Sequence, residues 1–413
     1  MSVKTLKNKL LRPSEIHISE GTVYVVLITM GVSHFLNDTI QSVIPAMYPI
    51  IKDNYGFSFA QIGLITLFFQ LASSIVQPIV GIYADKRPHP YSLTFGMWLT
   101  LFGLILLAYA NNFLLIVLAV TILGLGSSVF HPEASRVAQM ASGGKKSLAQ
   151  SIFQVGGNAG SAIGPLLAAW LILPYGQHAV SWVGVIAVIA AVILFEVGRW
   201  YSAKLTYMKQ HPKVVEGAAI HYSRRKKYGA MTILVVLMFS KYIYASCMTN
   251  YFTFFLMDKF DLSVQSAQYC LFAYLAAMAV GTLAGGVFGD KFGRKYVILG
   301  SIFGAAPFAL ILPYVSLGWT IFFAIMAGLI ISSAFSSILV YATDLYPKKV
   351  GMISGLFFGL MYGLAGVGSA FFGWLADRTS IEFIFHISTL LPLLGIVAAF
   401  LPNPQKKQLT INN

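Results

Sequence analysis

Three ionisable residues interrupt long apolar stretches of this sequence. His34 and Asp38 lie four residues apart near the middle of the first stretch, and Lys241 lies near the middle of the seventh. Residues at this spacing share one face of a helix. Ionisable side chains inside such stretches are energetically costly and typically bind protons, ions or charged ligands. We therefore predict a charged binding site built from these three residues.

The predicted site has the composition to hold an anion. A histidine and a lysine that face one cavity suit a charged oxyanion, such as a phosphonate head group. We predict that His34 and Lys241 contact the substrate. Further polar side chains are predicted to complete the binding site: Asn37, His131, Gln154 and Asn158. The alternative is a buried ion pair between Lys241 and Asp38 that only holds two parts of the chain together.

Two carboxylates, Asp38 and Glu133, are predicted to carry protons. Burial favours the protonated form of a carboxylate, and a nearby cation favours the ionised form. Proton and substrate can therefore bind alternately at Asp38, which is the physical basis of exchange. Asp38 could instead anchor His34 by a hydrogen bond. Glu133 is more readily explained as a gate residue, because Arg136 follows three residues later on the same helix face.

His131 precedes Pro132 and admits two explanations. It could line the cavity, or it could mark a local break in the helix, because proline lacks a backbone donor. No HExxH spacing or Cys/His set accompanies it, and Cys247 and Cys270 both lie in apolar stretches. We therefore predict no metal site and no cofactor. A membrane-embedded enzyme that uses the histidines and carboxylates for acid–base chemistry is a remote alternative.

These residues must be positioned by membrane helices. The 413-residue chain is 57% hydrophobic and 10% charged, whereas soluble domains carry about 25% charged residues. A helix crosses the bilayer with about 20 apolar residues, so we predict an all-α membrane protein with twelve transmembrane helices. They lie at roughly 22–50, 59–84, 91–110, 113–140, 147–172, 178–200, 229–257, 264–289, 294–315, 317–343, 350–376 and 381–401.

The basic residues indicate how these helices are oriented. The formal net charge is +14, and most lysines and arginines lie on one side of the predicted helices. Such an excess marks the cytoplasmic side, so we predict cytoplasmic termini and no nucleic-acid binding. The predicted divisions are a tail at 1–21, six-helix bundles at 22–200 and 229–401, a cytoplasmic connection at 201–228 and a tail at 402–413. We expect a monomer in the lipid bilayer.

Three short patterns recur in the two halves at one offset of about 206 residues. The matched segments are 81–86 and 286–291, 127–130 and 332–335, and 33–36 and 240–243. This offset places His34 opposite Lys241 across a pseudo-two-fold axis. The two halves are therefore predicted to enclose a shared central cavity.

The first of these patterns resembles the Gly-x-x-x-Asp-Arg/Lys-x-Gly-Arg-Lys signature of the major facilitator superfamily. The copy at 286–295 is nearly complete, whereas the copy at 81–86 continues as Arg-Pro-His-Pro. The resemblance implies that two six-helix bundles rock against each other and expose a central site to each side in turn. It also implies gate roles for residues in and near the signature: Asp85, Lys86, Glu133, Arg136, Asp290 and Arg294.

A second element resembles the Gly-x-x-x-Gly-Pro pattern of drug–proton antiporters in the same superfamily. It consists of Gly160, Gly164 and Pro165. Small residues at every fourth position let two helices approach closely. The element therefore implies either a gating role or close helix packing alone.

Three longer strings resemble the bacterial fosmidomycin resistance proteins, which are drug efflux members of the superfamily. They lie at 33–38, 126–136 and 148–158, and each holds polar residues within an apolar stretch. The resemblance implies a multi-pass protein of the bacterial cytoplasmic (inner) membrane. It would export the phosphonate fosmidomycin, and other toxic compounds, in exchange for protons. A transporter that takes up or exchanges organophosphates or other organic anions is the alternative.

Overall fold

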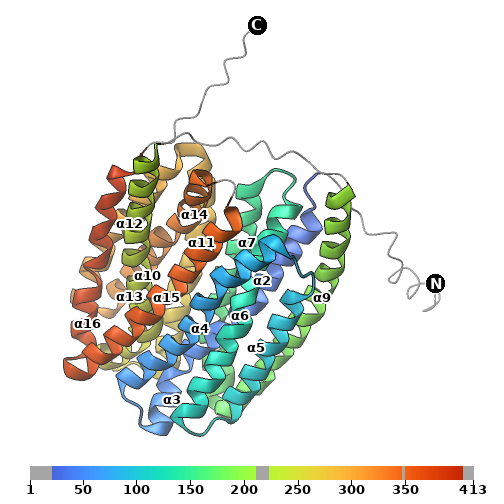
Figure 1. Cartoon of the computed structure of the whole chain (residues 1–413). Helices are drawn as coiled ribbons and strands as arrows, with labels where there is room; N and C mark the ends of the chain where they lie inside the picture. The colour runs from blue at the N-terminus through green and yellow to red at the C-terminus, as the bar shows by residue number, and fades with distance from the viewer. Residues whose placement is uncertain (1–20, 211–222, 347–348, 403–413) are drawn as a thin grey trace, which may run out of the picture.

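The computed structural model describes residues 21–210, 223–346 and 349–402, and every regular element in these ranges is helical (Figure 1). The first part contains α2 (Tyr24–Ala46), α3 (Tyr48–Tyr55), α4 (Phe59–Lys86), α5 (Ser92–Tyr109), α6 (Phe113–Ala141), α7 (Lys146–Leu167), a π-helical turn (Ala168–Ile172), α8 (Leu173–Tyr175), a 3-10 turn (Gln177–Ala179) and α9 (Val180–Gln210). The second contains α10 (Arg224–Phe260), α11 (Val264–Phe292), α12 (Arg294–Ile311), a 3-10 turn (Leu312–Tyr314), α13 (Leu317–Ser332), α14 (Ala334–Leu345), α15 (Val350–Arg378), α16 (Ile381–Ser388) and a 3-10 helix (Leu391–Phe400).

The predicted all-α membrane fold is confirmed. Within the described ranges, 11 helices are long and apolar enough to cross a membrane. The remaining predicted span, α2, is not among these 11 helices, because polar residues in its middle make it less apolar: His34, Asn37, Asp38 and Gln41. The predicted span that is least apolar is thus the one that carries most of the predicted charged site.

Side-chain caps fix where two of the site-bearing helices begin. Ser58 accepts a hydrogen bond from the backbone N–H of Gln61, and the Gln61 side chain accepts one from the N–H of Ser58 at the start of α4. Asn112 caps α6 by accepting from the N–H of Leu115. These caps satisfy backbone N–H groups in the first turns of α4 and α6.

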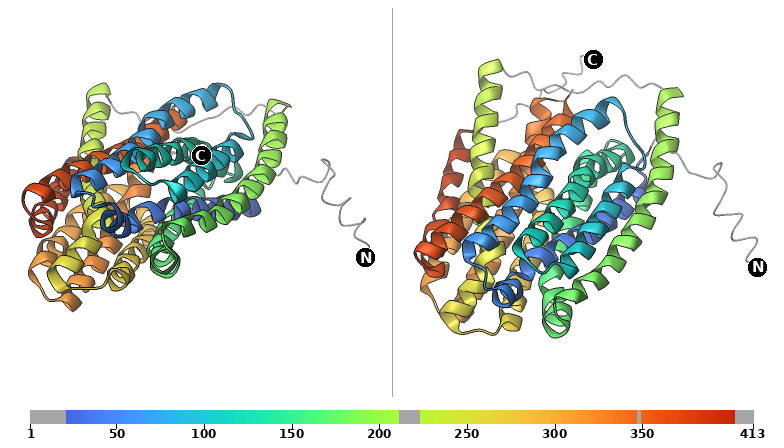
Figure 2. Two further views of the ribbon diagram at one scale, coloured as in Figure 1. Left: turned by 90° about the horizontal axis from the view of Figure 1, so that it is seen from below. Right: turned by 60° about the horizontal axis from the view of Figure 1, so that its bottom comes forward.

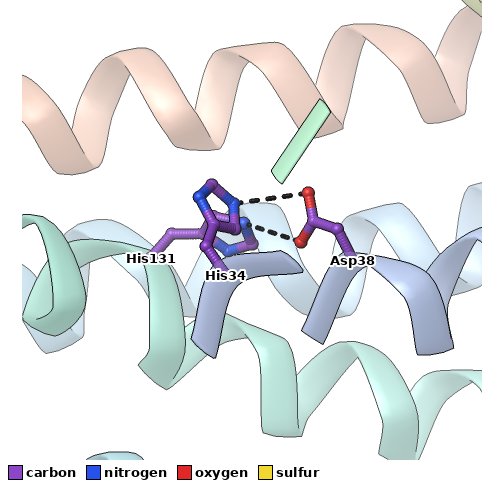
Figure 3. Close-up of side chains that lie close together, drawn as sticks. All are labelled: His34, Asp38 and His131. Atoms are coloured by element: carbon purple, nitrogen blue, oxygen red, sulfur yellow. Dashed lines mark ion pairs between the residues drawn. The ribbon is translucent and has the colours of Figure 1, made fainter. Parts of the chain in front are cut away.

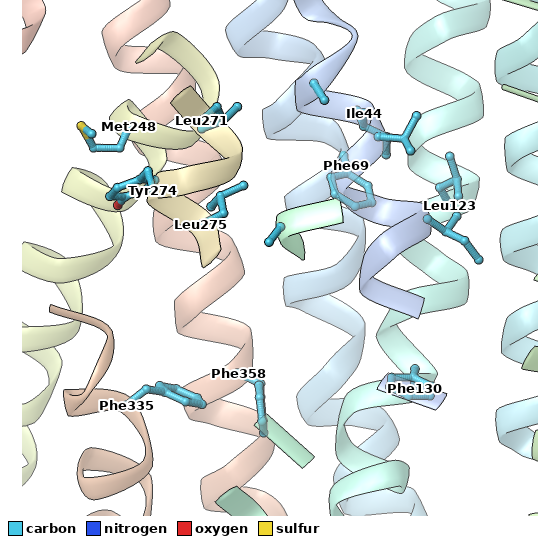
Figure 4. Packing of buried hydrophobic residues seen from close by; sticks show 14 of the residues in the cluster. Ile44, Phe69, Leu123, Phe130, Met248, Leu271, Tyr274, Leu275, Phe335 and Phe358 are labelled. Atoms are coloured by element: carbon cyan, nitrogen blue, oxygen red, sulfur yellow. The ribbon is translucent and has the colours of Figure 1, made fainter. Parts of the chain in front are cut away.

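Helices α2 to α9 form one bundle, and α10 to the last 3-10 helix form the other. In both views of Figure 2 the two bundles lie side by side, with α9 and α16 on opposite flanks. Buried apolar side chains fill both bundles (Figure 4), for example Phe69 and Leu123 in the first and Met248 and Tyr274 in the second. The bundles meet where α4 lies along α15 and where α7 lies along α11.

Glycines allow the close approach of α4 and α15. A Cβ atom at Gly359 would lie 2.9 Å from the carbonyl oxygen of Ser74, and one at Gly363 would lie 2.7 Å from the Ser74 hydroxyl. A larger side chain at either position would push the helices apart. This seam joins the two bundles along much of their length.

The two ends of the molecule differ in charge. At one end, uppermost in Figure 1, α9 ends and α10 begins with the basic run 224–227. Lys86 and Arg87, at the end of α4, belong to the same end and are exposed. We call it the basic end. The other, where α3 lies, is called the opposite end.

The structure corrects the predicted length of the connection between the bundles. The sequence predicted a connection at 201–228, but α9 continues to Gln210 and α10 begins at Arg224. Ser223 caps α10 by accepting from the N–H of Lys226. The middle of this connection and almost all of the two predicted tails lie outside the described residues.

The span predicted at 317–343 corresponds to one apolar span, Leu317–Leu345, in which Ser333 separates α13 from α14. The hydroxyl of Ser332 donates to the carbonyl oxygen of Leu329, and that of Ser333 donates to Ile330. Such bonds offer the backbone an alternative to continuing the helix.

Candidate functional site

Most of the predicted site residues line one small cavity between the bundles. The cavity measures about 70 Å³, which is room for a few water molecules. Predicted residues on its wall are His34, Asp38, His131, Gln154, Asn158 and Lys241. The wall also contains Tyr242, Met278, Ser332, Phe335, Phe358, Met361 and Tyr362. The sequence had therefore identified most of the polar wall, from four different helices.

On α2, Asp38 is held between polar neighbours. Its Oδ2 lies 3.3 Å from Nε2 of His34, one helical turn away, as the spacing predicted (Figure 3). Asn37 donates from Nδ2 to Oδ1 of Asp38 at 2.9 Å. Asn37 is buried and does not belong to the cavity wall. Its observed contact therefore orients the carboxylate.

His131 approaches the same carboxylate from α6. Its Nε2 lies 3.7 Å from Oδ1 of Asp38, so the two imidazoles lie side by side and both face the carboxylate (Figure 3). The same Nε2 lies 2.7 Å from the hydroxyl of Tyr362 on α15. Helix α6 continues through Pro132 without a break. His131 therefore lines the cavity and does not mark a break in the helix.

Backbone carbonyl groups orient both imidazole rings. Nδ1 of His34 lies 2.7 Å from the carbonyl oxygen of Phe153, and Nδ1 of His131 lies 3.3 Å from that of Ser127. A carbonyl oxygen only accepts, so Nδ1 carries the proton in each ring. Both Nε2 atoms therefore face Asp38, where a proton can be shared among the three groups.

Close packing of α7 against α2 supports this arrangement. A Cβ atom at Gly157 would lie 2.4 Å from the imidazole of His34 and 2.9 Å from Oδ2 of Asp38. The ring of His34 also stacks on that of Phe153, with centroids 4.0 Å apart. Glycine at 157 is thus required for the observed position of the His34 ring.

Lys241 is almost completely buried, at 2% exposure, and projects from α10. Its Nζ lies 3.5 Å from the carbonyl oxygen of Ser332, the last residue of α13. The C-terminal end of a helix carries partial negative charge and favours a cation. The rings of Tyr242 and Phe335 lie 5.2 and 5.6 Å from the same nitrogen.

The alternative ion pair of Lys241 with Asp38 is not present. In the part of the chain that the structure describes, the ion-pair partners of Asp38 are His34 and His131, and Lys241 contacts a carbonyl and two rings. The positive charge of Lys241 is therefore not neutralised by this carboxylate.

Two amides of α7 complete the polar wall. Asn158 donates from Nδ2 to the hydroxyl of Thr282 on α11. Gln154 is 6% exposed, and its Oε1 has no hydrogen-bond partner among the described residues. A buried amide oxygen in this state is available to a ligand or to water.

Comparisons with known proteins agree with this geometry. The profile of the Major Facilitator Superfamily matches residues 30–254 and 231–413, which is more than half of the chain. The chain belongs to the major facilitator superfamily. It is therefore a membrane transporter and not an enzyme.

Two relatives match most of the chain. The fosmidomycin resistance protein of Escherichia coli (strain K12) is 53% identical over 386 residues, which cover 94% of this chain and 95% of the relative. The uncharacterised MFS-type transporter YfnC of Bacillus subtilis (strain 168) is 41% identical over 391 residues, which cover 93% of this chain and 94% of the relative. The resemblance found in the sequence is confirmed.

A solved structure supports the fold. The chain is similar to a bacterial homologue of the human lysosomal transporter Spinster in an inward-facing and occupied conformation, with a TM-score of 0.67. The match covers 91% of this chain and 93% of the other, at 15% identity. At this identity the similarity concerns the superfamily fold alone.

The predicted gate residues lie near the basic end of the first bundle. Arg136 on α6 donates to the carbonyl oxygen of Ala84 on α4, next to Asp85. Glu133 is buried and accepts from the hydroxyl of Tyr201 on α9 at 3.3 Å. These contacts join three helices of one bundle. Lys86 is exposed, and the side chains of Asp85 and Asp290 lie outside the described residues.

In the second bundle, Arg294 forms an ion pair with Asp344. This pair joins the start of α12 to the end of α14. The sequence had singled out Arg294 as part of the superfamily signature, but it did not single out Asp344. No local pattern marks Asp344, because its partner lies 50 residues away along the chain.

The glycine–proline element packs against α2 of its own bundle. Cβ atoms at Gly160 and Gly164 would lie 2.2 Å from the carbonyl oxygen of Phe35 and 2.4 Å from the hydroxyl of Ser42. Pro165 follows inside α7, just before the π-helical turn. The contacts that the structure gives this element are therefore packing contacts, and a gating role remains a hypothesis.

His34, Asp38 and His131 also form a set of three metal-ligand types, with ligand atoms within 4.8 Å of one another. The sequence argument against a metal considered only local spacings, and it could not bring α2 and α6 together. In this structure the two Nε2 atoms contact Asp38, and that of His131 also contacts the hydroxyl of Tyr362.

Sequence reasoning did not assign a site role to Tyr362, Thr282 or the carbonyl group of Ser332. Tyr362 carries no distinctive signal in the sequence, because aromatic residues are common in membrane helices. The carbonyl of Ser332 lies at the end of α13, where it accepts from Lys241. Its only sequence signal was the pair Ser332–Ser333, which the internal repeat had matched to 127–128.

Proposed function

We propose that this protein exports fosmidomycin, and related toxic anions, in exchange for protons. The observation that carries the proposal is the 53% identity, over 94% of this chain, to the fosmidomycin resistance protein of Escherichia coli. The cavity between the bundles supplies a site of suitable chemistry, with a cation, amides and a proton-sharing group on its wall.

In this proposal Lys241 binds the phosphonate group. Its ammonium has carbonyl and aromatic neighbours, so an oxyanion can add strong charge-assisted hydrogen bonds. The Oε1 of Gln154, which has no partner among the described residues, would accept a hydrogen bond from the substrate. The amide of Asn158 would donate a hydrogen bond to the substrate. His34 and His131 contribute positive charge to the cavity when they are protonated.

Asp38 is the proposed proton carrier. It shares its position with two imidazoles, so a proton can lie on any of the three groups. Exchange requires the proton and the anion to occupy the site alternately, so binding of the anion must be coupled to release of the proton from this group. Glu133 is a second candidate, since it is buried near the basic end.

The proposed orientation places the basic end in the cytoplasm. Basic residues accumulate on the cytoplasmic side of bacterial membrane proteins, and the run 224–227 lies at this end. Both termini would then be cytoplasmic, and the protein would work as a monomer in the inner membrane. Gates at the two ends would open alternately as the bundles rock.

Everted membrane vesicles test the proposal. When the vesicle lumen is acidified, so that the proton gradient is directed outward, we expect vesicles that contain the protein to accumulate labelled fosmidomycin, and addition of an uncoupler to release it. Control vesicles should contain the Lys241→Ala variant. Accumulation only in right-side-out vesicles would favour the alternative, an organic-anion importer. Absence of gradient-driven movement in both preparations would overturn the proposed proton exchange.

A further inference from the structure

Two chains of polar contacts cross from one bundle to the other at the level of the cavity. Each begins at one of the charged residues and ends in the other bundle. The first runs from Asp38 through His131 to Tyr362. The second runs from Lys241 through the carbonyl group of Ser332 to Thr282 and Asn158.

The first chain links the carboxylate of the first bundle to α15 of the second. His131 is 1% exposed and lies between Asp38, at 3.7 Å, and the Tyr362 hydroxyl, at 2.7 Å. Since Nδ1 of His131 donates to Ser127, Nε2 accepts from Tyr362 while the ring is neutral. A proton on Nε2 would reverse that bond, so the contact between the bundles depends on the state of the site.

The second chain links the ammonium of the second bundle to α7 of the first. The carbonyl group of Ser332 accepts from Lys241 at 3.5 Å and lies 3.4 Å from the Thr282 hydroxyl. That hydroxyl also lies 3.0 Å from the carbonyl of Met278, and it accepts from Asn158. An anion bound by Lys241 competes with the Ser332 carbonyl and so acts on this chain directly.

Other hydrogen bonds between the bundles lie closer to the opposite end. The backbone of α4 donates to Asp377, Gln268 donates to the carbonyl group of Ala46, and Trp170 donates to the hydroxyl of Tyr269. These residues are not part of the cavity wall. The two chains therefore differ from them in that each contains groups that would bind cargo or protons.

We propose that Tyr362 and Thr282 are coupling residues, which tie the charge on Asp38 and Lys241 to the separation of the two bundles. They act through His131 and Ser332 and need not contact the cargo. The titratable groups around His131 are His34 and Asp38 from α2, Tyr362 from α15 and Lys241 across the cavity. The identity of the cargo rests on the proposed function, but the coupling geometry does not.

Distance measurements between the bundles test the proposal without any cargo. Spin labels are placed on Lys86 and Lys226 at the basic end, or on Asn54 and Asp258 at the opposite end, in a chain whose two cysteines are replaced by alanine. All four positions are exposed. In Tyr362→Phe and Thr282→Val we expect the share of molecules with a widened basic end to rise about two- to tenfold, the range for one lost hydrogen bond.

Matched controls remove equivalent bonds within a single bundle. Tyr251→Phe loses a bond of 2.7 Å to the carbonyl group of Ser369, and Thr100→Val loses one of 3.1 Å to that of Gly96. We expect both controls to leave both distances unchanged. Thr282→Ser retains the hydroxyl and should behave like the unaltered chain. The opposite-end distance should not change in any of these variants, because its own bonds remain.

A double-mutant cycle separates coupling from a merely structural effect. In a His131→Ala background, Tyr362→Phe should cause no further widening, whereas Thr282→Val should still do so. Unchanged distances in both single variants, equal widening in the controls, or full additivity with His131→Ala would each overturn the proposal. Failure of fosmidomycin to bind would overturn only the proposed function, since no fosmidomycin is added here.

Discussion

The charge of Lys241 is the clearest determinant of anion binding in this cavity. Its contacts are a carbonyl group and two aromatic rings. We expect Lys241→Ala to weaken fosmidomycin binding about 10- to 100-fold, as for the loss of a hydrogen bond to a charged group. Equilibrium binding of labelled fosmidomycin to purified protein measures this. Lys226→Ala, in the exposed basic run, is the control and should bind normally. Equal affinity of the two variants would contradict the assignment.

Asp38 should be required for energy coupling more than for binding. Asparagine preserves its size and accepts the hydrogen bond from Asn37, but it cannot take up a proton. We expect Asp38→Asn to abolish transport driven by a pH gradient in vesicles and to retain exchange of labelled for unlabelled fosmidomycin. Asp53→Asn alters an exposed carboxylate of α3 and should leave both activities intact. Gradient-driven transport by Asp38→Asn would exclude the proton role.

Residue chemistry was predictable where a charge interrupts an apolar stretch. His34, Asp38 and Lys241 could be recognised because burial of such groups is unfavourable without a compensating role. Tyr362 could not be recognised in this way, since a tyrosine is compatible with a packing role in a membrane helix. Its site role depends on where α15 meets α6, and that distance is a property of the assembled bundles.

At the scale of helices, apolar length predicted where the spans lie, but it did not predict their interruptions. The break between α13 and α14 occurs within a continuous apolar stretch. The hydroxyls of Ser332 and Ser333 bond to preceding carbonyl groups there, and such bonds compete with the backbone pattern of the helix. The extension of α9 to Gln210 was also missed, because a helix that leaves the bilayer no longer needs apolar residues.

The packing of α7 on α2 can be tested at Gly157. A methyl group there would meet the His34 ring at 2.4 Å, and such overpacking costs about 1–3 kcal/mol. We expect Gly157→Ala to lower the melting temperature of the purified protein and to weaken transport, because the His34 ring must move away from Asp38.

Gly300→Ala is the matched control for this change. No atom lies within 4 Å of a Cβ at Gly300, which is also in a helix. Alanine should therefore be neutral there or raise the melting temperature, because it favours the helix more than glycine does. A Gly157→Ala protein as stable and active as Gly300→Ala would show that the close approach of α7 is unimportant.

At the scale of the whole molecule, the opposite end is closed by bonds between the bundles. The carboxylate of Asp377, near the end of α15, accepts from the backbone N–H groups of Phe59 and Ala60 at 2.9 and 2.7 Å. These are the first residues of α4, where the positive end of the helix dipole favours an anion. One side chain of the second bundle thus caps a helix of the first.

Alternating access requires this cap to break whenever the opposite end opens. We expect Asp377→Ala to increase the population open at that end about three- to tenfold, as for the loss of charge-assisted hydrogen bonds at an exposed site.

A cysteine at Met361, on the cavity wall, reports the opening in an otherwise cysteine-free chain. A membrane-impermeant maleimide added to intact cells should label it correspondingly faster in Asp377→Ala. Asp258→Ala removes an exposed carboxylate near the C-terminal end of α10, at the same end of the molecule, and should not change the labelling rate. Equal labelling of the two variants would mean that packing of α4 on α15, and not this cap, keeps the opposite end closed.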